Sequence, residues 1–362
     1  MRSRLEFNTF MGDNKKFSQL EIWDDIYFNT VCNRVYLDTA ITLMQSVRTY
    51  HPGCKFVIGL AETDQWVAEN PWVHDLGFDA VISGSNLHPK YETLSQKYDI
   101  TQLCCAVKAN LMKETLALSP RGIAIFMDPD TYAYSALSEV VKALEDGHDI
   151  VLTPHLLKGI DAEMEMSSTR HGIFNLGFLG VANTESCISF LDWWDSRLQE
   201  YSTDNPMRGY FNDQTWASLG VGFTDAFVLR HAGYNFATWT LRTSILKQDA
   251  GSLSVDGHPL RFIHFSGYKS GGLKNTIAKW EVTNSQSAFC EILESYEKHV
   301  SEVNLELQAR KVSIEIKDIS AQMQIDNLSR RVRLAIPLKS KISVFIYQAS
   351  PKLHRFLKRV IS

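Results

Sequence analysis

The tripeptide Asp128-Pro129-Asp130 places two carboxylates directly after the apolar run 123–127. Such a run is typical of a buried central strand, and open α/β sheets bind their ligands at the carboxyl ends of strands. The proline makes the turn rigid, so both carboxylates can face one point. Two oxygen ligands suit Mg²⁺ or Mn²⁺ when substrate phosphates complete the coordination shell. The alternative is an ordinary Asp-Pro-Asp turn, but the placement after a buried strand favours the metal.

The first half of the chain alternates strands and helices around this tripeptide. We expect a strand at 26–31, a helix ended by His51-Pro52-Gly53, and a strand at 56–60, which together form a parallel pair with a right-handed crossover. The apolar stripe of that helix is Leu37, Ala40, Ile41, Met44 and Val47. Further elements expected are a strand at 80–82, a helix capped by Asp99 or Thr101 and running to Leu118, a helix capped by Ser135, and a strand at 150–152.

The second half is mixed rather than parallel. A strand at 174–181, a helix at 184–201 and a hairpin turned at Asp256-Gly257 that returns through residues 260–265 are expected. From Ser285 a long helix carries apolar residues at steps of 3 and 4, too few heptads to decide for or against a coiled coil. We therefore expect an α/β domain over residues 20–282 and a helical, basic C-terminal extension over residues 283–362.

Composition excludes several classes of protein. Of 362 residues, 44% are hydrophobic and 22% charged, which excludes intrinsic disorder, and a net charge of −4 disfavours a protein that coats nucleic acid. Six cysteines without a CxxC spacing suggest reduced thiols in a cytoplasmic protein. The first residues lack the apolar stretch of a signal peptide, and no run approaches the length of a membrane span.

The last part of the chain is strongly basic. Residues 327–362 hold nine Lys or Arg and no Asp or Glu, which leaves a net charge of −13 in the rest of the chain. Basic and apolar positions interleave there, so this tail is expected to bind anionic lipid peripherally, on the inner face of the membrane. A solvated terminal helix or a partner-binding arm is the alternative.

Several segments of the chain resemble one family of enzymes. Asp128-Pro129-Asp130 resembles the DXD motif of nucleotide-sugar-dependent glycosyltransferases with the GT-A fold. The other matching segments are Asn29-Thr30-Val31-Cys32-Asn33 with Tyr36, Ala106-Val107-Lys108, Ile173-Phe174-Asn175-Leu176-Gly177-Phe178, Asn212-Asp213-Gln214 and His264-Phe265-Ser266-Gly267. They follow the family order over about two-thirds of the chain. The resemblance is to retaining enzymes of the glycogenin and bacterial lipopolysaccharide galactosyltransferase type.

This resemblance implies a GT-A-like, Rossmann-related mixed sheet and a role for each segment. The donor would be a nucleotide sugar, with UDP expected as the nucleotide. The donor-binding residues it implies are Thr30, Val31, Cys32, Asn33, Tyr36, Lys108, Asp128, Asn175, Gly177, Gly267 and Lys269. His264 would join Asp128 and Asp130 as a third metal ligand, a set that suits Mn²⁺ at least as well as Mg²⁺. Outside the motif, a histidine near a strand end is more often structural.

Two features leave alternatives open. Lys269 departs from the family, in which the lysine comes one place later and precedes Pro-Trp. Three interpretations stay open: Lys269 binds the diphosphate, it is a surface lysine, or the Gly-rich stretch around it forms a mobile lid. Asp213 and Gln214 are the candidate catalytic residues. The resemblance favours retention of configuration, whereas Asp213 acting as a base would give inversion, and Asp213 as a helix N-cap is the structural alternative.

Aromatic side chains in this chain are candidates for packing against a sugar. Trp193 and Trp194 lie on the expected helix 184–201 and are interpreted as core, whereas Trp216 and Trp239 are candidates for acceptor contact. His155 and Asp161, in the stretch after the expected strand at 150–152, are also candidates for acceptor contact, with a solvated loop as the alternative. The family resemblance implies a metal-dependent glycosyltransferase that transfers a hexose to a glycan, such as a lipid-linked bacterial surface polysaccharide intermediate. The alternatives are a non-catalytic nucleotide- or carbohydrate-binding protein on the same fold, and a hydrolase or phosphotransferase acting on a diphosphate.

Overall fold

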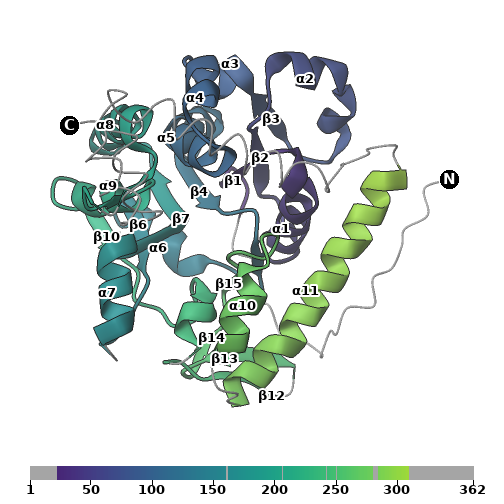
Figure 1. The fold of residues 1–362 in the computed structure, drawn as a ribbon, viewed down its shortest axis with the longest axis vertical. Helices are drawn as coiled ribbons and strands as arrows, with labels where there is room; N and C mark the ends of the chain where they lie inside the picture. Colours follow the sequence, from purple (N-terminus) through teal and green to yellow (C-terminus); the bar gives the residue numbers. More distant parts are fainter. Residues whose placement is uncertain are drawn as a thin grey trace, which may run out of the picture.

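The computed structural model describes residues 23–159, 162–205, 207–241, 243–249, 251–279 and 284–309. Its centre is a sheet with the strand order β10-β6-β7-β4-β1-β2-β3 (Figure 1). The strands are β1 (Tyr27–Cys32), β2 (Lys55–Leu60), β3 (Ala80–Ser83), β4 (Ile123–Met127), β6 (Ile150–Pro154), β7 (Phe174–Ala182) and β10 (Ala226–Val228). Within this sheet β7 runs antiparallel to β4 and β6, and the other neighbours are parallel. The expected mixed, Rossmann-related α/β class is confirmed.

Helices cover both faces of this sheet, as the alternation of strands and helices predicts. They are α1 (Leu37–Tyr50), α2 (Asp64–Glu69), α3 (Gly84–Leu87), α4 (Tyr91–Lys97), α5 (Ile100–Leu118), α6 (Ser138–Glu145), α7 (Ala162–His171), α8 (Glu185–Tyr201), α9 (Gln214–Gly220), α10 (Gly272–Lys279) and α11 (Asn284–Ala309). Short 3₁₀ helices are η1 (Arg34–Tyr36), η2 (Pro71–Asp75) and η3 (Thr238–Thr240). Of the two caps offered for α5, Asp99 is the one used, since its carboxylate accepts the Gln102 N–H at 3.0 Å.

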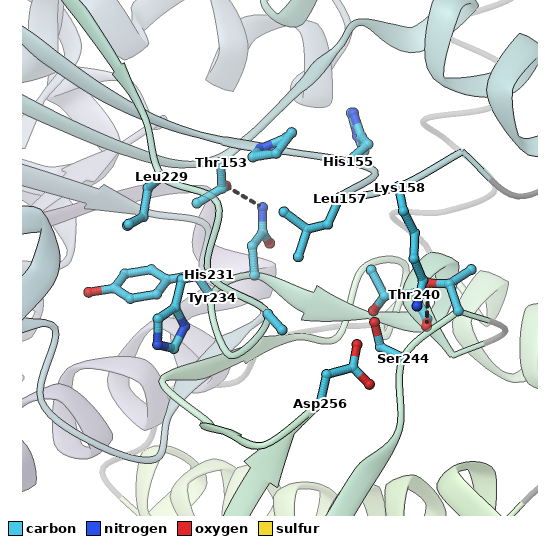
Figure 2. A pocket seen from close by; sticks show the side chains of 14 residues that line it. Thr153, His155, Leu157, Lys158, Leu229, His231, Tyr234, Thr240, Ser244 and Asp256 are labelled. Atoms are coloured by element: carbon cyan, nitrogen blue, oxygen red, sulfur yellow. Dashed lines mark hydrogen bonds between the residues drawn. The ribbon is translucent and has the colours of Figure 1, made fainter.

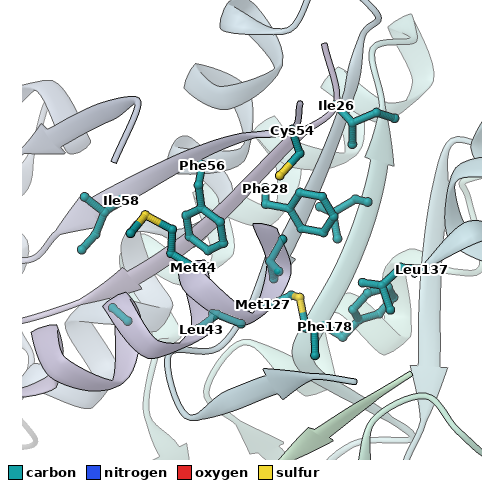
Figure 3. Packing of buried hydrophobic residues seen from close by; sticks show 14 of the residues in the cluster. Ile26, Phe28, Leu43, Met44, Cys54, Phe56, Ile58, Met127, Leu137 and Phe178 are labelled. Atoms are coloured by element: carbon teal, nitrogen blue, oxygen red, sulfur yellow. The ribbon is translucent and has the colours of Figure 1, made fainter. Parts of the chain in front are cut away.

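Two hydrophobic cores form because side chains alternate between the faces of each strand. Phe28 of β1 packs with α1 and α6, whereas Val31 on the opposite face packs with α5 and α8. Figure 3 shows the first core, where Met44 of α1 lies beside Phe56 of β2. Each buried aliphatic or phenylalanine side chain contributes roughly 1.5–3 kcal/mol. These cores hold the carboxyl ends of β1 and β4 in place.

A strand that the sequence analysis missed follows the Asp128-Pro129-Asp130 turn. It is β5 (Thr131–Ala133), which pairs antiparallel with β15 (Phe262–His264), and β15 pairs in turn with β11 (Phe236–Ala237). The register sets His264 opposite Thr131. The small sheet therefore brings His264 next to the acidic turn.

The expected hairpin is present beside this small sheet. Strands β12 (Leu246–Asp249), β13 (Ser252–Val255) and β14 (His258–Pro259) form an antiparallel meander, and β8 (Asp204–Asn205) pairs with β9 (Tyr210–Phe211). Asp256 and Gly257 both have positive φ values, +51° and +82°, as a tight hairpin turn requires. The chain then leaves the hairpin for β15 rather than continuing it.

The long helix α11 packs against the domain itself. Figure 1 shows it beside α1, and Val303 and Leu307 join the core that contains α1. Tyr296 stacks on Phe265 with ring centroids 4.1 Å apart. The apolar stripe of α11, for which a coiled coil was one interpretation, is therefore buried within this chain. The division at residue 282 stays a prediction, and the tail 327–362 lies outside the described residues.

Three smaller expectations have definite outcomes. Ser135 does not cap α6, because that helix begins at Ser138 and the Ser135 hydroxyl instead donates to the Leu260 carbonyl at 2.7 Å. All six cysteines are free thiols, as expected. Among the described residues, no helix combines the length and the apolar character needed to cross a bilayer.

Candidate active site

A cleft of about 780 Å³ opens at the carboxyl ends of β1 and β4. Its volume falls in the range of small-molecule sites. The walls come from the end of β1 and the segment after it, the acidic turn after β4, the beginning of β7, helix α7, the start of α9 and the loop after β15. Open α/β sheets bind ligands at this edge.

The acidic turn and His264 converge in this cleft. Asp128, Asp130 and His264 each offer a ligand atom, and these atoms lie within 4.8 Å of one another. His264 Nε2 is 3.2 Å from Asp130 Oδ1 and 3.8 Å from Asp128 Oδ2. Two carboxylates and an imidazole nitrogen suit Mn²⁺ or Mg²⁺. The structure brings together the three residues that the sequence singled out.

Backbone contacts hold the three side chains in this arrangement. The Asp128 N–H donates to the Gly177 carbonyl at 2.9 Å, and the Phe265 N–H donates to the Asp130 carbonyl at 2.8 Å. Gly177 also faces the imidazole: a Cβ built there would lie 2.3 Å from His264 Cε1. Only glycine admits the imidazole at this point. The donor set and its glycine cradle fit a divalent cation.

Electrostatics around the cluster follow from burial and mutual charge. Burial raises the pKa of Asp128, with Lys108 and His264 acting in the opposite direction. Burial alone would lower the pKa of His264, but Asp130 and Asp128 raise it above its usual value. Carboxylates that hold a positive charge on a neighbour are prepared to bind a cation.

Lys108 lies at the floor of the cleft rather than at its surface. It is 3% exposed, donates to the Leu176 carbonyl at 2.8 Å, and its Nζ is 2.6 Å from Asp213 Oδ2 and 3.7 Å from Asp128 Oδ1. Burial lowers the pKa of Lys108, but Asp128 and Asp213 outweigh it and raise that pKa above its usual value. Lys108 therefore stays charged and links the two carboxylates.

Asp213 and Gln214 start helix α9 beside this lysine. The Asp213 side chain makes no capping bond, so the structural alternative of an N-cap is not what the structure shows. The Asp213 carbonyl accepts the Trp194 indole N–H at 3.1 Å, and Trp194 is fully buried, as the core interpretation expected. Gln214 Oε1 accepts the Leu176 N–H at 3.0 Å, and its Nε2 donates to the His171 carbonyl at 2.9 Å.

The segment after β1 lines the opposite end of the cleft. Val31, Cys32, Asn33 and Tyr36 contribute to the wall there. Thr30 does not, because its side chain points into the protein and is fully buried. This end is the part of the cleft where the resemblance expects the nucleotide.

The loop after β15 closes one side of the cleft. Gly267 lines it with φ +79°, a left-handed conformation that favours glycine. The Lys269 ammonium forms an ion pair with the buried Asp38 carboxylate of α1. In this arrangement Lys269 is committed to α1, not to the cleft.

Of the two tryptophans expected to contact the acceptor, one lines the cleft and the other does not. Trp239 lines the cleft, with ring centroids 5.5 Å from both His155 and His264. Trp216 instead stacks on Tyr201, with centroids 5.5 Å apart, and is not part of the cleft wall. His155 belongs to the wall, and Asp161 lies outside the described residues.

Sequence reasoning missed part of this site. Helix α7 adds Ser167, Ser168 and His171 to the wall, and a surface helix with mixed polar residues gives no signal of that role. Asn235 is buried at 4% exposure with φ +52°, and its amide contacts His264. A buried asparagine in a left-handed turn is visible only in the folded chain.

Comparison with known proteins gives distant similarities. No family model matches the chain. Two proteins of Bacillus subtilis (strain 168) are similar in sequence, "Uncharacterized protein YfnF" and "Uncharacterized protein YfnD". YfnF is 24% identical over 205 residues, 54% of this chain and 66% of YfnF. YfnD is 29% identical over 256 residues, 67% of this chain and 78% of YfnD. The chain thus spans just under two thirds of YfnF.

Solved glycosyltransferase structures are also similar to the chain. Mouse xyloside xylosyltransferase 1 is 15% identical with a TM-score of 0.38, covering 66% of this chain and 97% of that one. Galactosyltransferase LgtC, in complex with donor and acceptor sugar analogs, is 13% identical with a TM-score of 0.40, covering 72% and 98%. The bifunctional glycosyltransferase WbbM is 10% identical with a TM-score of 0.45, covering 75% and 52%.

Proposed function

We propose that the chain is a metal-dependent glycosyltransferase that moves a hexose from a UDP-linked sugar to a glycan acceptor. The observation that carries this proposal is the convergence of Asp128, Asp130 and His264 in the large cleft, next to the Lys108–Asp213 ion pair. One cavity holds a candidate cation site, a wall that could contact a nucleotide, and a buried carboxylate. Glycosyl transfer from a nucleoside diphosphate needs all three.

Asp128, Asp130 and His264 would hold Mn²⁺ or Mg²⁺ through two carboxylate oxygens and the imidazole Nε2. When bound, the cation supplies positive charge that stabilises a departing diphosphate. The remaining donor contacts fall to the wall formed by Val31, Cys32, Asn33 and Tyr36 and to the backbone around Asn175, Gly177 and Gly267. Lys269 would reach the donor only after leaving Asp38.

Lys108 and Asp213 act at the sugar end of the site. The Lys108 ammonium orients both Asp128 and Asp213 from below, so the two carboxylates keep a fixed separation. A general base must direct a free lone pair at the acceptor hydroxyl. Lys108 engages Asp213 Oδ2 at 2.6 Å, which leaves Oδ1 as the oxygen that could do so. We propose retention of configuration, as the family resemblance implies, with Asp213 as the carboxylate nearest the reaction. The Gln214 amide is fully engaged by protein groups, which suits a residue that holds the site in shape.

The acceptor would enter past Trp239 and helix α7. An aromatic ring offers an apolar face to the C–H groups of a sugar, and Trp239 is the indole that lines the cleft among the described residues. Ser167, Ser168 and His171 add hydrogen-bonding groups on the α7 side. An apolar ring beside hydrogen-bonding groups suits a glycan, which presents both C–H groups and hydroxyls.

A lipid-linked acceptor would connect the site to the basic tail. We place the protein in the cytoplasm, on the inner face of the membrane, with residues 327–362 binding anionic lipid. Flotation with phosphatidylglycerol vesicles tests this: the full chain should float, and a chain shortened after residue 326 should not. Equal flotation of both would remove the membrane proposal.

The proposed activity is tested by offering a panel of nucleotide sugars without acceptor. One UDP-sugar should be hydrolysed slowly by the wild-type protein with Mn²⁺, and neither by Asp130→Asn nor after chelation of the metal. Binding of UDP without consumption of any donor would favour the non-catalytic alternative. Consumption of donor by Asp130→Asn at the wild-type rate would contradict the assignment of the metal site.

A further inference from the structure

A network of side-chain amides lies behind His264, and two backbone N–H groups fix its orientation. The Leu176 N–H donates to Gln214 Oε1 at 3.0 Å, and the Gly177 N–H donates to Asn175 Oδ1 at 3.1 Å. A backbone N–H can only donate, so these side-chain atoms must be the acceptor oxygens. Asn175 Nδ2 then donates to Gln214 Oε1 at 3.1 Å, consistent with that choice.

His155 confirms the direction of the network from the other side. Its Nδ1 lies 2.8 Å from the Gly172 carbonyl, which can only accept, so this nitrogen carries the proton. His155 Nε2 is left as an acceptor, 3.2 Å from Asn175 Nδ2. Burial lowers the pKa of His155 to about 4, so the ring is neutral near pH 7. Asn175 thus presents its oxygen, not its amino group, toward His264.

Asn235 completes the arrangement around His264. Its Nδ2 donates to Thr153 Oγ1 and to Asn175 Oδ1, both at 3.0 Å, which turns its Oδ1 toward the imidazole. His264 Nδ1 therefore faces two oxygens, Asn175 Oδ1 at 3.1 Å and Asn235 Oδ1 at 3.3 Å. Two acceptors require a proton on Nδ1. The lone pair of a neutral His264 is then on Nε2, the nitrogen that faces Asp128 and Asp130.

We infer that Asn235, together with Asn175, is a positioning residue that fixes the Nδ1–H tautomer of His264 and so keeps Nε2 ready for a divalent cation. This inference rests on the metal site of the proposed function. Histidines that bind metals are generally oriented by such a partner on the other ring nitrogen.

The backbone at Asn235 allows its side chain to be deleted without strain. Its φ of +52° is a left-handed conformation in which glycine is the least strained residue. The backbone conformation at this position therefore does not depend on the Asn235 side chain. Behind it is a polar cavity of about 40 Å³, and Figure 2 shows Thr153, His155 and Tyr234 around it. Water entering there can satisfy Thr153 when the Asn235 amide is removed.

Asn235→Gly is the decisive variant, because it deletes the amide and suits the left-handed backbone. Asp25→Gly is its matched control, since Asp25 is another left-handed residue, φ +66°, and is exposed just before β1, whose opposite end lines the cleft. Asn235→Asp retains an oxygen facing His264 Nδ1 but loses the amino group that donates to Asn175 Oδ1, so it serves as a partial rescue. Thermal unfolding without metal shows whether each variant is folded.

The measurement is Mn²⁺ binding by the full chain, followed through the electron paramagnetic resonance signal of free Mn²⁺. We expect Asn235→Gly to bind about 10–100-fold more weakly than wild type, the usual effect of losing such a partner. Asp25→Gly should match wild type, and Asn235→Asp should recover part of the affinity. Wild-type affinity in a folded Asn235→Gly, with binding lost in Asp130→Ala, would overturn the inference and leave the metal site standing. Absence of Mn²⁺ binding by the wild type, or full binding by Asp130→Ala, would overturn the metal site itself and the inference with it.

Discussion

Gly177 and His264 are in such close contact that a methyl group on Gly177 would overlap the imidazole, with a built Cβ 2.3 Å from Cε1 and 2.6 Å from Nδ1. Gly177 comes from the long strand β7, whereas His264 ends the short strand β15. The central sheet and the small sheet therefore meet at the proposed metal ligands. The position of His264 depends on the absence of a side chain on β7.

Gly177→Ala should displace His264 while leaving the cores intact. Overlap at 2.3 Å cannot be relieved by a flexible side chain, because the ring is buried and held on Nδ1. We expect metal-dependent consumption of the donor to fall at least about tenfold, as for a lost metal-positioning contact. Gly222→Ala, at an exposed glycine near the end of α9, is the control and should behave as wild type. Equal Mn²⁺ affinity in Gly177→Ala and wild type would show that the contact does not position the ligand.

His51 makes stability fall in acid for a reason unrelated to the cleft. Its Nδ1 lies 2.6 Å from the Val47 carbonyl and its Nε2 accepts the Leu137 N–H at 2.9 Å, so the buried ring is neutral. Burial lowers the pKa of His51 to about 4. Between that value and the unfolded value of about 6.5 the unfolded chain binds more protons, so stability declines as pH falls.

We expect His51 to lower the free energy of unfolding by about 2 kcal/mol when the pH falls from 7 to 5, at about 1.4 kcal/mol per pKa unit. Urea unfolding of wild type and His51→Gln at both pH values measures it. The wild type should lose about 2 kcal/mol more than the variant on acidification. Parallel losses in the two proteins would show that His51 is not the group that takes up the proton.

Asp213 is predicted to act in a reaction that retains the anomeric configuration. Asp213→Asn removes the charge opposite Lys108 and should slow transfer about 10²–10⁴-fold, the usual contribution of a group that acts in the transition state. The product anomer is read by NMR once the donor is known. An inverted product would instead identify Asp213 as the base and contradict the proposed retention.

Trp239→Ala should separate acceptor binding from donor chemistry. Because this indole lines the cleft beside His155, its loss should raise the acceptor KM about tenfold, equivalent to about 1.4 kcal/mol of contact. Hydrolysis of the donor without acceptor should change little. Trp216→Ala is the matched control, since Trp216 packs on Tyr201 outside the cleft wall. Equal acceptor KM values in the two variants would exclude Trp239 as the platform.

The sequence predicted the central sheet because each of its elements is long and periodic. The crossover from β1 through α1 to β2, and the buried strand β4 before Asp128, follow from apolar runs that local patterning reveals. The acidic turn and His264 were found through their motifs. Their meeting depends on the pairing of β5 with β15, two three-residue strands too short to show a period.

The remaining features arise from tertiary contacts that no local pattern carries. The seam of α11 has the same spacing in a coiled coil as in a helix buried on its own domain, and packing against α1 selects the second. Ser135 has the residue type of a cap, but its hydroxyl bonds to Leu260, far away in the chain. Asn235 acquires its role through Thr153 and Asn175, which only the fold brings near it.

The most direct test of the central claim is the effect of UDP on thermal unfolding, with and without Mn²⁺, in wild type and Asp130→Ala. Ligand binding to the folded state at one hundred times its dissociation constant stabilises by about 2.7 kcal/mol. We predict that this stabilisation appears in wild type only when UDP and Mn²⁺ are both present, and that Asp130→Ala loses it. A full, metal-dependent stabilisation in Asp130→Ala would contradict the assignment of Asp128, Asp130 and His264 as the cation site.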